Sequence, residues 1–482
     1  MKLEELKNKK ILVVGVGVEG VAVFNYFKKH LPQNVIKVVD QKDGDNYLDC
    51  QKDFNIAIKS PGVKRELLKI PYTTATNIFL SNAKGKVIGV TGTKGKSTTS
   101  TLVYKMLKGQ GFDAYLGGNI GEPSLDFLDK LNDQSWTVLE MSSFQLEDVK
   151  ISPHIAVILM ITAEHMDRYK EIDDYVDTKR NIIKFQTPSD FIVINRDYPA
   201  SNESDIHTKG KVYFVSRERE AKEGCFIRDG KIVLRIPARL MHAVRLARDA
   251  QIKSQNQSRS LNEIRQQPNS LSNVDLEPDF SCLTGDKSCI EGVVINTKDI
   301  LLPGKHNLEN ICAAVMAASL AGVAKENMVK VLKTFKGLEH RLEFVSEKNG
   351  IKFYNDSLAT IPEAAIEALE TLPETETLIA GGFDRGLDFS NLGIKIVNSK
   401  VKTLILFPTT GEKIWQAVCK ASKTNLPEKF EATSMDQAVG IASAETLPGS
   451  ICLMSPASAS FGLFKNYKDR GNQFKEEVQK IG

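Results

Sequence analysis

Short runs of Val and Ile recur along this chain, and each ends at a polar or glycine residue before a helical pattern begins. Strands that are apolar on both faces and alternate with helices are typical of parallel sheets covered on both sides. The pattern therefore predicts an α/β protein. The runs that we expect to form strands are Ile11–Val14, Val35–Val39, Val87–Val90, Val138–Met141, Ile155–Ile161, Phe191–Ile194, Thr377–Ile379 and Thr403–Phe407.

The strand–helix pattern restarts three times, and the length of 482 residues also suits about three domains. The expected domains cover residues 1–85, 86–337 and 338–482, with a polar insertion in the central domain at about 234–295. Ser, Asn and Gln supply 13 of the 21 residues of Lys253–Asn273, which is too polar to form a packed core and predicts a mobile segment. Four Arg among the apolar residues of Leu234–Lys253 predict a basic amphipathic helix, for which a solvated face is favoured over a membrane or nucleic-acid role.

Composition excludes several classes of protein. Lys and Arg number 64 against 60 Asp and Glu, and this small, dispersed excess does not indicate a nucleic-acid partner. No run of 18 apolar residues occurs and the N-terminus lacks an apolar stretch, so we expect neither a membrane span nor a signal peptide. The seven Cys include no CxxC pair, which argues against a disulfide framework or a zinc site. We expect a cytoplasmic monomer.

The first expected strand runs directly into a glycine turn, Gly15–Gly20 (GVGVEG), and Asp40 closes the next strand. Glycines at this spacing permit a tight turn and the close approach of a diphosphate to a helix N-terminus. The turn predicts diphosphate binding without naming the nucleotide. A purely structural turn in a flavodoxin-like domain is the alternative.

A second and stronger glycine turn, Gly92–Thr98 (GTKGKST), follows the expected strand Val87–Val90. In such a loop backbone N–H groups cradle phosphates, a Lys reaches the β- and γ-phosphoryl oxygens and a hydroxyl holds Mg²⁺. The loop is shorter than a strict Walker A motif, because Val90 stands where that motif has its first Gly. An incidental turn is the alternative. Two phosphate-binding turns together predict a protein that couples a nucleotide-linked substrate to chemistry driven by ATP.

Three residues outside the turns are further candidate ligands. Glu140 ends an expected strand, where a carboxylate would lie beside the phosphate loop. His165 neighbours acids at another strand exit and is equally suited to a metal or phosphate contact and to a structural role. Lys179, taken alone, is indistinguishable from a surface lysine.

The order of these motifs along nearly the whole chain resembles the Mur ligase family. The matching segments are GTKGKST at Gly92–Thr98, GGNIG at Gly117–Gly121, EMSSFQLE at Glu140–Glu147, ITAEHMDRY at Ile161–Tyr169, GKHNLEN at Gly304–Asn310, His340 with Arg341, NDS at Asn355–Ser357 and the tail Ser455–Phe474. The SSFQLE segment, the first glycine turn and the FKNYKDRG tail resemble the members that add glutamate to UDP-N-acetylmuramoyl-L-alanine.

The resemblance implies a Rossmann-like UDP-binding domain, a central P-loop ATPase-like domain with a parallel sheet, and a C-terminal Rossmann-like domain. It also implies an ATP-dependent ligase of peptidoglycan synthesis. In that reaction ATP phosphorylates the carboxylate of UDP-N-acetylmuramoyl-L-alanine, and the amine of D-glutamate attacks the acyl phosphate. Positioning and charge neutralisation would supply most of the catalysis.

By resemblance, the expected catalytic residues are Lys96, Glu140, His165 and Lys179. The expected ligands of two Mg²⁺ ions are Ser97, Glu140, His165 and a carbamylated Lys179, whose carbamate oxygens suit a hard cation. The expected ATP-binding residues are Gly92, Thr93, Lys94, Gly95, Lys96, Ser97, Thr98, His306, Asn307, Asn310, Arg341 and Asp356. Those for the UDP-linked substrate are Gly15, Gly17, Val18, Glu19, Gly20, Asp40, Gln41, Ser60, Pro61, Gly62, Asn119 and Ser142. Those for glutamate are Thr360, Arg385, Ser460 and Tyr467.

Four positions depart from the family pattern. Leu358 stands where many members have a Lys that touches the phosphate, Met160 where Asn is common, and Thr178 where Ala usually precedes the modified lysine. Arg385 replaces a Lys that often binds glutamate, a role that an Arg fork can serve. Leu358 and Met160 leave open altered kinetics, a preference for L-glutamate, or a nucleotide-binding homologue with weakened catalysis. An NAD-dependent oxidoreductase is a further alternative, but it leaves the second turn unexplained.

Overall fold

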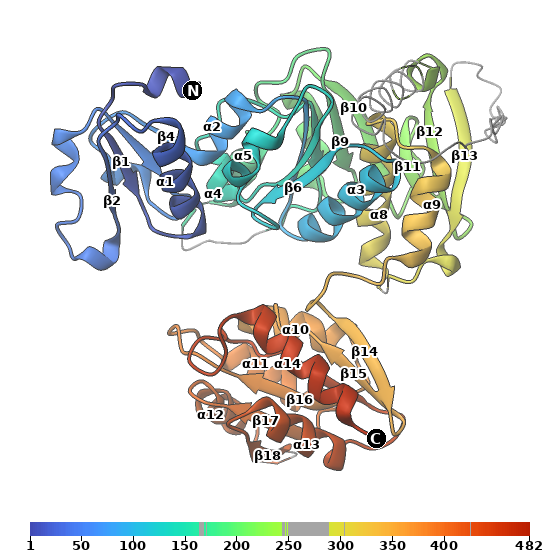
Figure 1. Cartoon of the computed structure of the whole chain (residues 1–482). Helices are drawn as coiled ribbons and strands as arrows, with labels where there is room; N and C mark the ends of the chain where they lie inside the picture. Colours follow the sequence, from blue (N-terminus) through green and yellow to red (C-terminus); the bar gives the residue numbers. More distant parts are fainter. Residues whose placement is uncertain are drawn as a thin grey trace, which may run out of the picture. The chain divides into compact units, whose positions relative to one another are not determined.

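The alternating strands and helices form three sheets, as the computed structural model in Figure 1 shows. The structure describes residues 1–162, 168–169, 171–242, 246, 248, 289–302, 304–424 and 426–482. These residues form two compact units, Met1–Phe335 and Lys336–Gly482. All eight predicted strands occur, with their ends shifted by up to three residues. The α/β fold class is confirmed, whereas the three domain ranges stay predictions.

The first sheet has four parallel strands in the order β2-β1-β3-β4. Its strands are β1 (Ile11–Val14), β2 (Ile36–Val39), β3 (Ile56–Lys59) and β4 (Tyr72–Thr74), and its helices are α1 (Val18–His30) and α2 (Ala75–Asn82). Successive strand residues point to opposite faces. Ile11 and Val13 accordingly pack with Phe27 of α1, whereas Leu12 and Val14 belong to a separate cluster on the other face.

The second sheet has nine strands in the order β13-β12-β11-β10-β9-β8-β5-β7-β6. They are β5 (Lys86–Thr91), β6 (Ala114–Gly118), β7 (Trp136–Glu140), β8 (Ile155–Ile158), β9 (Phe191–Asn195), β10 (Lys211–Ser216), β11 (Gly224–Arg228), β12 (Lys231–Pro237) and β13 (Cys289–Asn296). The helices are α3 (Lys96–Gly109), α4 (Ser143–Leu146), α5 (Ile172–Arg180), α6 (Pro199–Asn202), α8 (His306–Leu320) and α9 (Lys325–Thr334). Helices α3 and α8 lie side by side against this sheet (Figure 1).

The sheet differs from the prediction at its β13 end. The strands from β6 to β11 are parallel, but β12 pairs antiparallel with both β11 and β13. The expected insertion at 234–295 therefore begins and ends inside paired strands. Residues 234–237, predicted as part of a basic helix, belong to β12, whereas the described residues 238–242 are helical, as predicted. Arg235, expected on a basic helix, forms an ion pair with Glu291 across the two strands. Lys253–Asn273 lies outside the described residues.

One apolar core joins the first two sheets. It contains β1 and β3 residues together with Ile78 and Phe79 of α2, and it continues into Leu125, Phe127 and Ile158 of the second sheet region. The rings of Phe79 and Phe127 meet edge to face with centroids 5.6 Å apart, a favoured aromatic geometry. This shared core explains why residues 1–335 form a single compact unit.

The second unit contains a six-stranded sheet in the order β14-β15-β19-β16-β17-β18, in which only the β14–β15 pair is antiparallel. Its strands are β14 (Glu343–Lys348), β15 (Ile351–Asn355), β16 (Thr375–Gly381), β17 (Thr403–Phe407), β18 (Glu428–Glu431) and β19 (Ile451–Met454). Its helices are α10 (Pro362–Thr371), α11 (Ser390–Val397), α12 (Gly411–Ala421), α13 (Met435–Glu445) and α14 (Tyr467–Lys480).

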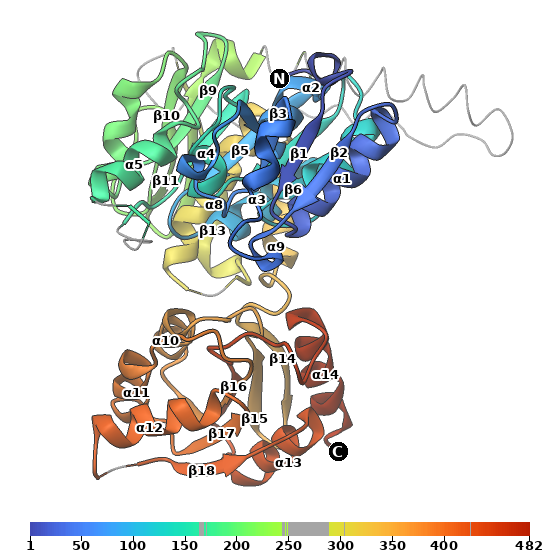
Figure 2. The same ribbon diagram turned by 90° about the vertical axis from the view of Figure 1, so that its left-hand side faces the viewer.

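Helices cover both faces of this sheet: α10, α11 and α12 pack on one face, and α13 and α14 pack on the other (Figure 2). In β16, Leu378 and Ala380 pack with the cluster that contains α10, α11 and α12 residues. Ile379, between them, packs with α13 and α14 residues on the opposite face. The two-residue period of a strand therefore accounts for the continuous apolar runs in the sequence.

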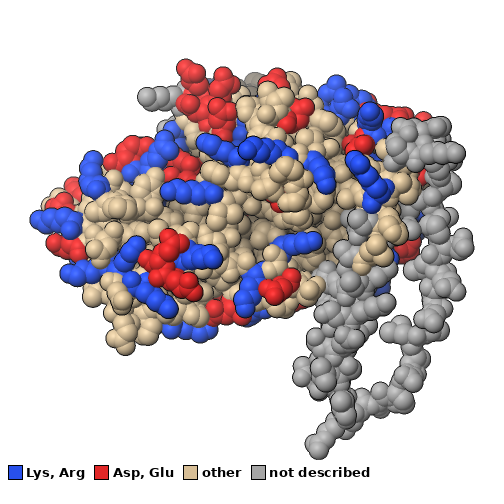
Figure 3. Space-filling view, turned by 90° about the horizontal axis from the view of Figure 1, so that it is seen from above, with Lys and Arg blue, Asp and Glu red and all other residues tan. Residues whose placement is uncertain are grey.

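The sequence predicted no membrane span and a dispersed surface charge. None of the described helices is both long enough and apolar enough to cross a membrane. On the face shown in Figure 3, Lys and Arg side chains are interspersed with Asp and Glu side chains. The six described cysteines are free thiols.

Candidate active site

The first glycine turn connects β1 to α1 and requires its glycines. Gly15 has a φ of +97°, and a Cβ there would lie 2.8 Å from the side chain of Ser60. A Cβ on Gly20 would lie 1.9 Å from the carbonyl oxygen of Gly15. Asp40 Oδ2 accepts a hydrogen bond of 2.7 Å from the Val16 N–H, and this bond is the largest influence that lowers the pKa of Asp40. Asp40 therefore stabilises the backbone of the first glycine turn.

Several of the other residues predicted for the UDP-linked substrate lie beside this turn. Helix α1 begins at Val18, and its N-cap residue is Gly17. Because glycine has no side chain to accept from the first N–H groups of the helix, these groups can donate to an anion. Ser60, Pro61 and Gly62 follow β3, and the Ser60 hydroxyl donates to the Gly15 carbonyl over 3.0 Å. Gln41 is exposed just after Asp40.

The second glycine turn, Gly92–Thr98, connects β5 to α3 and is closed by a distant helix. Gly95 has a φ of +85°, and a Cβ there would lie 2.0 Å from Asn310 Oδ1. Asn310 is buried on α8 and its amide donates to Asn307 Oδ1 over 3.1 Å. His306 is the first residue of the same helix. The structure thus brings Asn310, one of the α8 residues predicted to bind ATP, against the loop, although its role stays a prediction.

Two lysine ammonium groups reach the carbonyls of the second turn. Lys96 Nζ donates to the Gly92 and Thr93 carbonyl oxygens at 3.0 and 2.8 Å. Lys179 Nζ, on α5, donates to Gly92 over 2.9 Å and lies 4.6 Å from the centre of the Tyr175 ring. Because Lys179 is only 1% exposed, the interpretation as a surface lysine is wrong.

Glu140, at the end of β7, has the environment of a cation ligand. It is buried, and its Oε1 accepts a 2.8 Å hydrogen bond from the Asn119 amide. Its Oε2 is buried without a hydrogen-bond partner, and a free carboxylate oxygen suits a hard cation such as Mg²⁺. Among the described residues no three His, Cys, Asp or Glu side chains cluster as a metal site, and His165 lies outside those residues. Glu140 therefore fits an ion held in part by other oxygen donors, such as the predicted Ser97 hydroxyl.

A cavity of about 310 Å³ joins the candidate catalytic residues to those predicted for the UDP-linked substrate. Its lining consists of Glu19, Pro61, Lys96, Asn119, Ser142, Ser143, Phe144, Gln145, Tyr175 and Lys179. The sequence had singled out six of them. It missed Ser143, Phe144, Gln145 and Tyr175. The Ser142–Gln145 pair has the spacing of a capping box, which the structure contains, and that spacing was a readable signal.

Glu19 brings a carboxylate into this cavity from α1. Burial raises the pKa of Glu19, while a hydrogen bond from Gln145 and the positive charge of Lys59 lower it. The Gln145 amide thereby connects α4 to α1. The cavity wall is therefore a polar network contributed by both sheet regions of the first unit.

Asp356, predicted to bind ATP, is buried in the second unit. Its Oδ2 accepts from the Ser455 hydroxyl at 2.7 Å and its Oδ1 from the Leu342 N–H at 3.1 Å. Burial raises the pKa of Asp356 to about 7. Arg341 precedes Leu342, so the His340–Leu342 segment is tied to this carboxylate.

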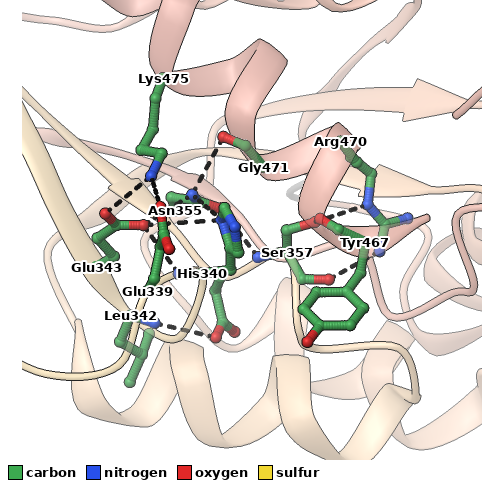
Figure 4. Close-up of polar contacts among 11 residues, drawn as sticks. Glu339, His340, Leu342, Glu343, Asn355, Ser357, Tyr467, Arg470, Gly471 and Lys475 are labelled. Carbon is green, nitrogen blue, oxygen red and sulfur yellow. Dashed lines mark hydrogen bonds and ion pairs between the residues drawn. The ribbon is translucent and has the colours of Figure 1, made fainter. Parts of the chain in front are cut away.

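Arg470, which the sequence analysis did not single out, is a fully buried residue of α14 (Figure 4). Its guanidinium donates to the hydroxyl and carbonyl oxygens of Ser357 at 3.0 and 2.9 Å, and to the Ser458 carbonyl at 3.1 Å. Burial lowers the pKa of Arg470 to about 9. The Ser357 hydroxyl donates to the Tyr467 carbonyl. Arg470 therefore links the segment after Asp356 to the segment before Ser460.

The residues predicted for glutamate all belong to the second unit. Ser460 is buried, and Tyr467 begins α14 with its ring 6.1 Å from that of His340 (Figure 4). Arg385 is exposed and lies over the Phe461 ring at 5.5 Å. Thr360 is half-buried just before α10. Their common role in glutamate binding stays a prediction.

Both units of the chain resemble parts of known proteins. Residues 90–236 match the model of the Mur ligase middle domain, and residues 340–458 match that of the Mur ligase, glutamate ligase domain. The UDP-N-acetylmuramoylalanine--D-glutamate ligase of Acetivibrio thermocellus is 32% identical over 99% of this chain and 98% of its own length. The enzyme of that name from Thermoanaerobacter sp. is 32% identical over 99% of both chains.

Two solved structures have a similar fold. The MurF ligase of Thermotoga maritima in complex with ADP covers 99% of this chain and 97% of its own, with a TM-score of 0.51 and 17% identity. MurF from Acinetobacter baumannii covers 90% of this chain and 88% of its own, with a TM-score of 0.54 and 15% identity. At such low identity these likenesses concern the fold alone.

Proposed function

The chain belongs to the Mur ligase family, and we propose that it joins D-glutamate to UDP-N-acetylmuramoyl-L-alanine at the expense of ATP, a step of peptidoglycan synthesis. The name shared by relatives of about 32% identity over nearly the full length supports this proposal. The observation that carries it is the cavity in which Lys96 and Lys179 lie with Asn119 and Ser142. The lysine proposed to bind phosphate and the side chains proposed to bind the UDP-linked substrate therefore line the same cavity.

The proposed reaction has two steps. A carboxylate oxygen of the alanyl group attacks the γ-phosphorus of ATP, and ADP leaves, which forms an acyl phosphate. The amine of glutamate then attacks the carbonyl carbon, an amine proton is lost, and phosphate leaves as the amide forms. Both steps depend on bringing anionic groups together, so positioning and neutralisation of charge are the main contributions of the protein.

We assign these contributions to residues of the first unit. The backbone N–H groups of Gly92–Thr98 hold the phosphates and Lys96 neutralises the transferring group. Asn119 and Ser142 orient the muramoyl-alanine portion. Lys96 bonds to the carbonyls of its own loop in this structure, and it has to exchange these bonds for phosphate oxygens when ATP binds.

Mur ligases use ATP and Mg²⁺. We propose two ions, one held by Ser97 and Glu140 and one by His165 and a carbamylated Lys179. When bound, Mg²⁺ neutralises phosphate charge in the transfer. The unpartnered Glu140 Oε2 supports the first assignment. The burial of Lys179 beside Gly92 supports the second, because a carbamate converts the ammonium into an oxygen donor.

The remaining assignments follow the same proposal. The first glycine turn binds the UDP moiety, and Arg341 and Asp356 contribute to ATP binding. Thr360, Arg385, Ser460 and Tyr467 bind glutamate. Asp356 has both carboxylate oxygens engaged by Ser455 and Leu342, which fixes its orientation before any ligand arrives. We also propose that the protein acts as a cytoplasmic monomer.

The test is an assay with ATP, Mg²⁺, UDP-N-acetylmuramoyl-L-alanine and labelled D- or L-glutamate. We expect D-glutamate to enter the product with release of one phosphate per amide, and L-glutamate to be rejected. Incorporation of L-glutamate alone would contradict the assigned stereochemistry. Binding of both nucleotides without amide formation would identify a homologue with weakened catalysis, the alternative that Leu358 raises.

A further inference from the structure

Lys59 is a fully buried lysine at the junction of the two sheet regions of the first unit. It ends β3, and its ammonium lies 3.0 Å from Asp148 Oδ2 and 3.6 Å from Glu147 Oε2. It also donates to the Val63 carbonyl oxygen over 3.1 Å. An ammonium group is costly to bury unless it is paired, so these three contacts fix the side chain in one place.

The two carboxylates are themselves held by other residues. The Tyr72 hydroxyl donates to Asp148 Oδ1 over 2.8 Å, and the Asn77 amide donates to the Asp148 carbonyl over 2.7 Å. Glu147 Oε2 also pairs with Arg168 at 3.0 Å. Lys59 therefore binds to a rigid point, since residues of β4 and α2 restrain the same segment.

The two segments that Lys59 contacts, the Ser60–Val63 loop and the residues after α4, both adjoin the cavity. On one side, Pro61 of the Ser60–Val63 loop lines the cavity, and Lys59 bonds across that loop to Val63. On the other side, helix α4 contributes Ser143, Phe144 and Gln145 to the lining, and Glu147 follows the helix directly. The side chain of Lys59 does not line the cavity itself.

We propose that Lys59 is a positioning residue for the UDP-linked substrate. By binding Asp148 and the Val63 carbonyl at once, it holds the Ser60–Val63 loop at a constant distance from α4, so that the two cavity walls keep the spacing that the substrate needs. The inference rests on the proposed function for the identity of the ligand. It adds a residue that the motifs and the cavity lining both leave out.

A matched control exists in the same unit. Lys29 of α1 pairs with Asp129 of the short 3₁₀ segment Leu128–Lys130 at 2.6 Å. This pair also links the two sheet regions, but the Lys29 side chain is 67% exposed and does not line the cavity. Exposed pairs contribute little to stability, and His30 of the same helix also contacts Asp129 Oδ2 at 2.9 Å. Lys29→Met therefore removes a lysine–aspartate pair between the two regions without disturbing the walls.

The experiment titrates UDP-N-acetylmuramoyl-L-alanine into the full-length wild type and the variants Lys59→Met, Lys29→Met and Lys59→Met/Asp148→Asn, with calorimetry for Kd and thermal unfolding for stability. We expect Lys59→Met to weaken substrate binding by about tenfold or more, since small displacements of positioning groups have effects of this size. The KM for ATP and the affinity of Lys29→Met should stay near wild-type values. The double variant should regain the lost stability, because no buried carboxylate is left unpaired, but not the affinity, because Val63 is still not held.

Recovery of both stability and affinity in the double variant would overturn the proposal, since Lys59 would then only balance a buried charge. Unchanged affinity in Lys59→Met, or an equal loss for ATP, would overturn it as well. If Lys59→Met does not fold, the double variant decides, and failure of both to fold counts against a positioning role. If the wild type binds no substrate, the proposed function fails, and the same variants are then compared with UDP as the probe.

Discussion

The two glycine turns of the first unit follow the same pattern of strand, turn and helix, yet different contacts hold them. The first turn is held by a carboxylate and a hydroxyl from strands of its own sheet, through Asp40 on Val16 and Ser60 on Gly15. The second turn accepts two lysine ammonium groups on its carbonyls and packs against Asn310 of a distant helix.

This difference suits the two kinds of phosphate binding that we propose for the turns. A turn held by a carboxylate presents backbone N–H groups and a helix N-terminus, which suit a diphosphate that is bound and left unchanged. A turn surrounded by lysines can neutralise charge that moves during a phosphoryl transfer. The following predictions test whether the first turn binds a diphosphate and the second turn acts in phosphoryl transfer.

Lys96→Ala should have the largest effect. Loss of the ammonium leaves the transferring phosphoryl group without its neutralising cation, so ligation should fall by about 10²–10³-fold or more. Steady-state kinetics measure this loss, and calorimetry with UDP alone should show unchanged binding. Because Lys96 lines the cavity with Asn119, the complete substrate is the less selective probe. Equal loss of UDP binding would contradict the division between the turns.

Lys179→Ala should lower activity by about 10²-fold, because the proposed second Mg²⁺ would lose its proposed carbamate ligand. Added acetate should restore part of the activity by placing a carboxylate in the vacated space. Lys179→Arg should not respond, since the guanidinium fills that space and keeps a positive charge. The assay is run with and without acetate at saturating Mg²⁺, and full activity of the Ala variant without acetate would exclude the carbamate.

Gly95→Ala should destabilise the second turn. The positive φ costs about 1–2 kcal/mol for an alanine, and the new Cβ would meet Asn310 Oδ1 at 2.0 Å. Thermal unfolding should show a lower midpoint, and the KM for ATP should rise. Adding Asn310→Gly removes the contact and leaves the φ strain, so the double variant should recover in part. No recovery would mean that α8 does not close this turn.

Gly15→Ala should have a smaller effect on the first turn. The φ of +97° again disfavours alanine, but the Cβ would meet Ser60 at the longer distance of 2.8 Å. We expect a loss of about 1–2 kcal/mol and weaker UDP binding. Gly17→Ala is the matched control, since its φ is −68° and nothing lies within 4 Å of the added Cβ. If both variants behave alike, the turn does not depend on the close approach to Ser60.

The smallest expected effect concerns Asp40. Its lowered pKa means that the bond to Val16 stabilises the folded turn above the ordinary Asp pKa, and that this contribution is lost as pH falls through the lower folded value. Hydrogen exchange of the Val16 amide should therefore lose protection by a few-fold as the pH falls below about 4, the ordinary Asp value, once the intrinsic pH dependence of exchange is removed. Asp40→Asn should abolish this change. Persistence of the pH effect in Asp40→Asn would assign it to another group.

The structure also shows which residues could be predicted and which could not. The eight strands and both glycine turns were predicted because apolar runs and glycine spacing are local signals. Lys179 was singled out only by resemblance, since a lone lysine on a helix carries no sign of burial. Gln145 had a readable capping spacing, but Tyr175 and Arg470 had none, because each is defined by what lies beside it in the fold.

The polar insertion at about 234–295 shows what the sequence could not predict. Its middle was predicted from composition and lies outside the described residues, and its ends were placed inside β12 and β13. An arginine such as Arg235 argues against a buried strand when it stands alone. It is accommodated because Glu291, 56 residues later, lies opposite it on the neighbouring strand, and because Glu220 and the Ala221 carbonyl oxygen accept its other donors. Such a pairing is invisible until the strands meet.

The sequence by itself determined the α/β fold class, the positions of eight strands and those of both glycine turns, because these follow from side-chain period and backbone geometry over a few residues. Only the tertiary structure decided which distant side chains complete the site. Asn310 against Gly95, Lys179 against Gly92, and Lys59 between Val63 and Asp148 are contacts between separate elements. Their partners are chosen by how helices and sheets pack, and packing depends on shape and burial summed over the whole unit rather than on any local pattern.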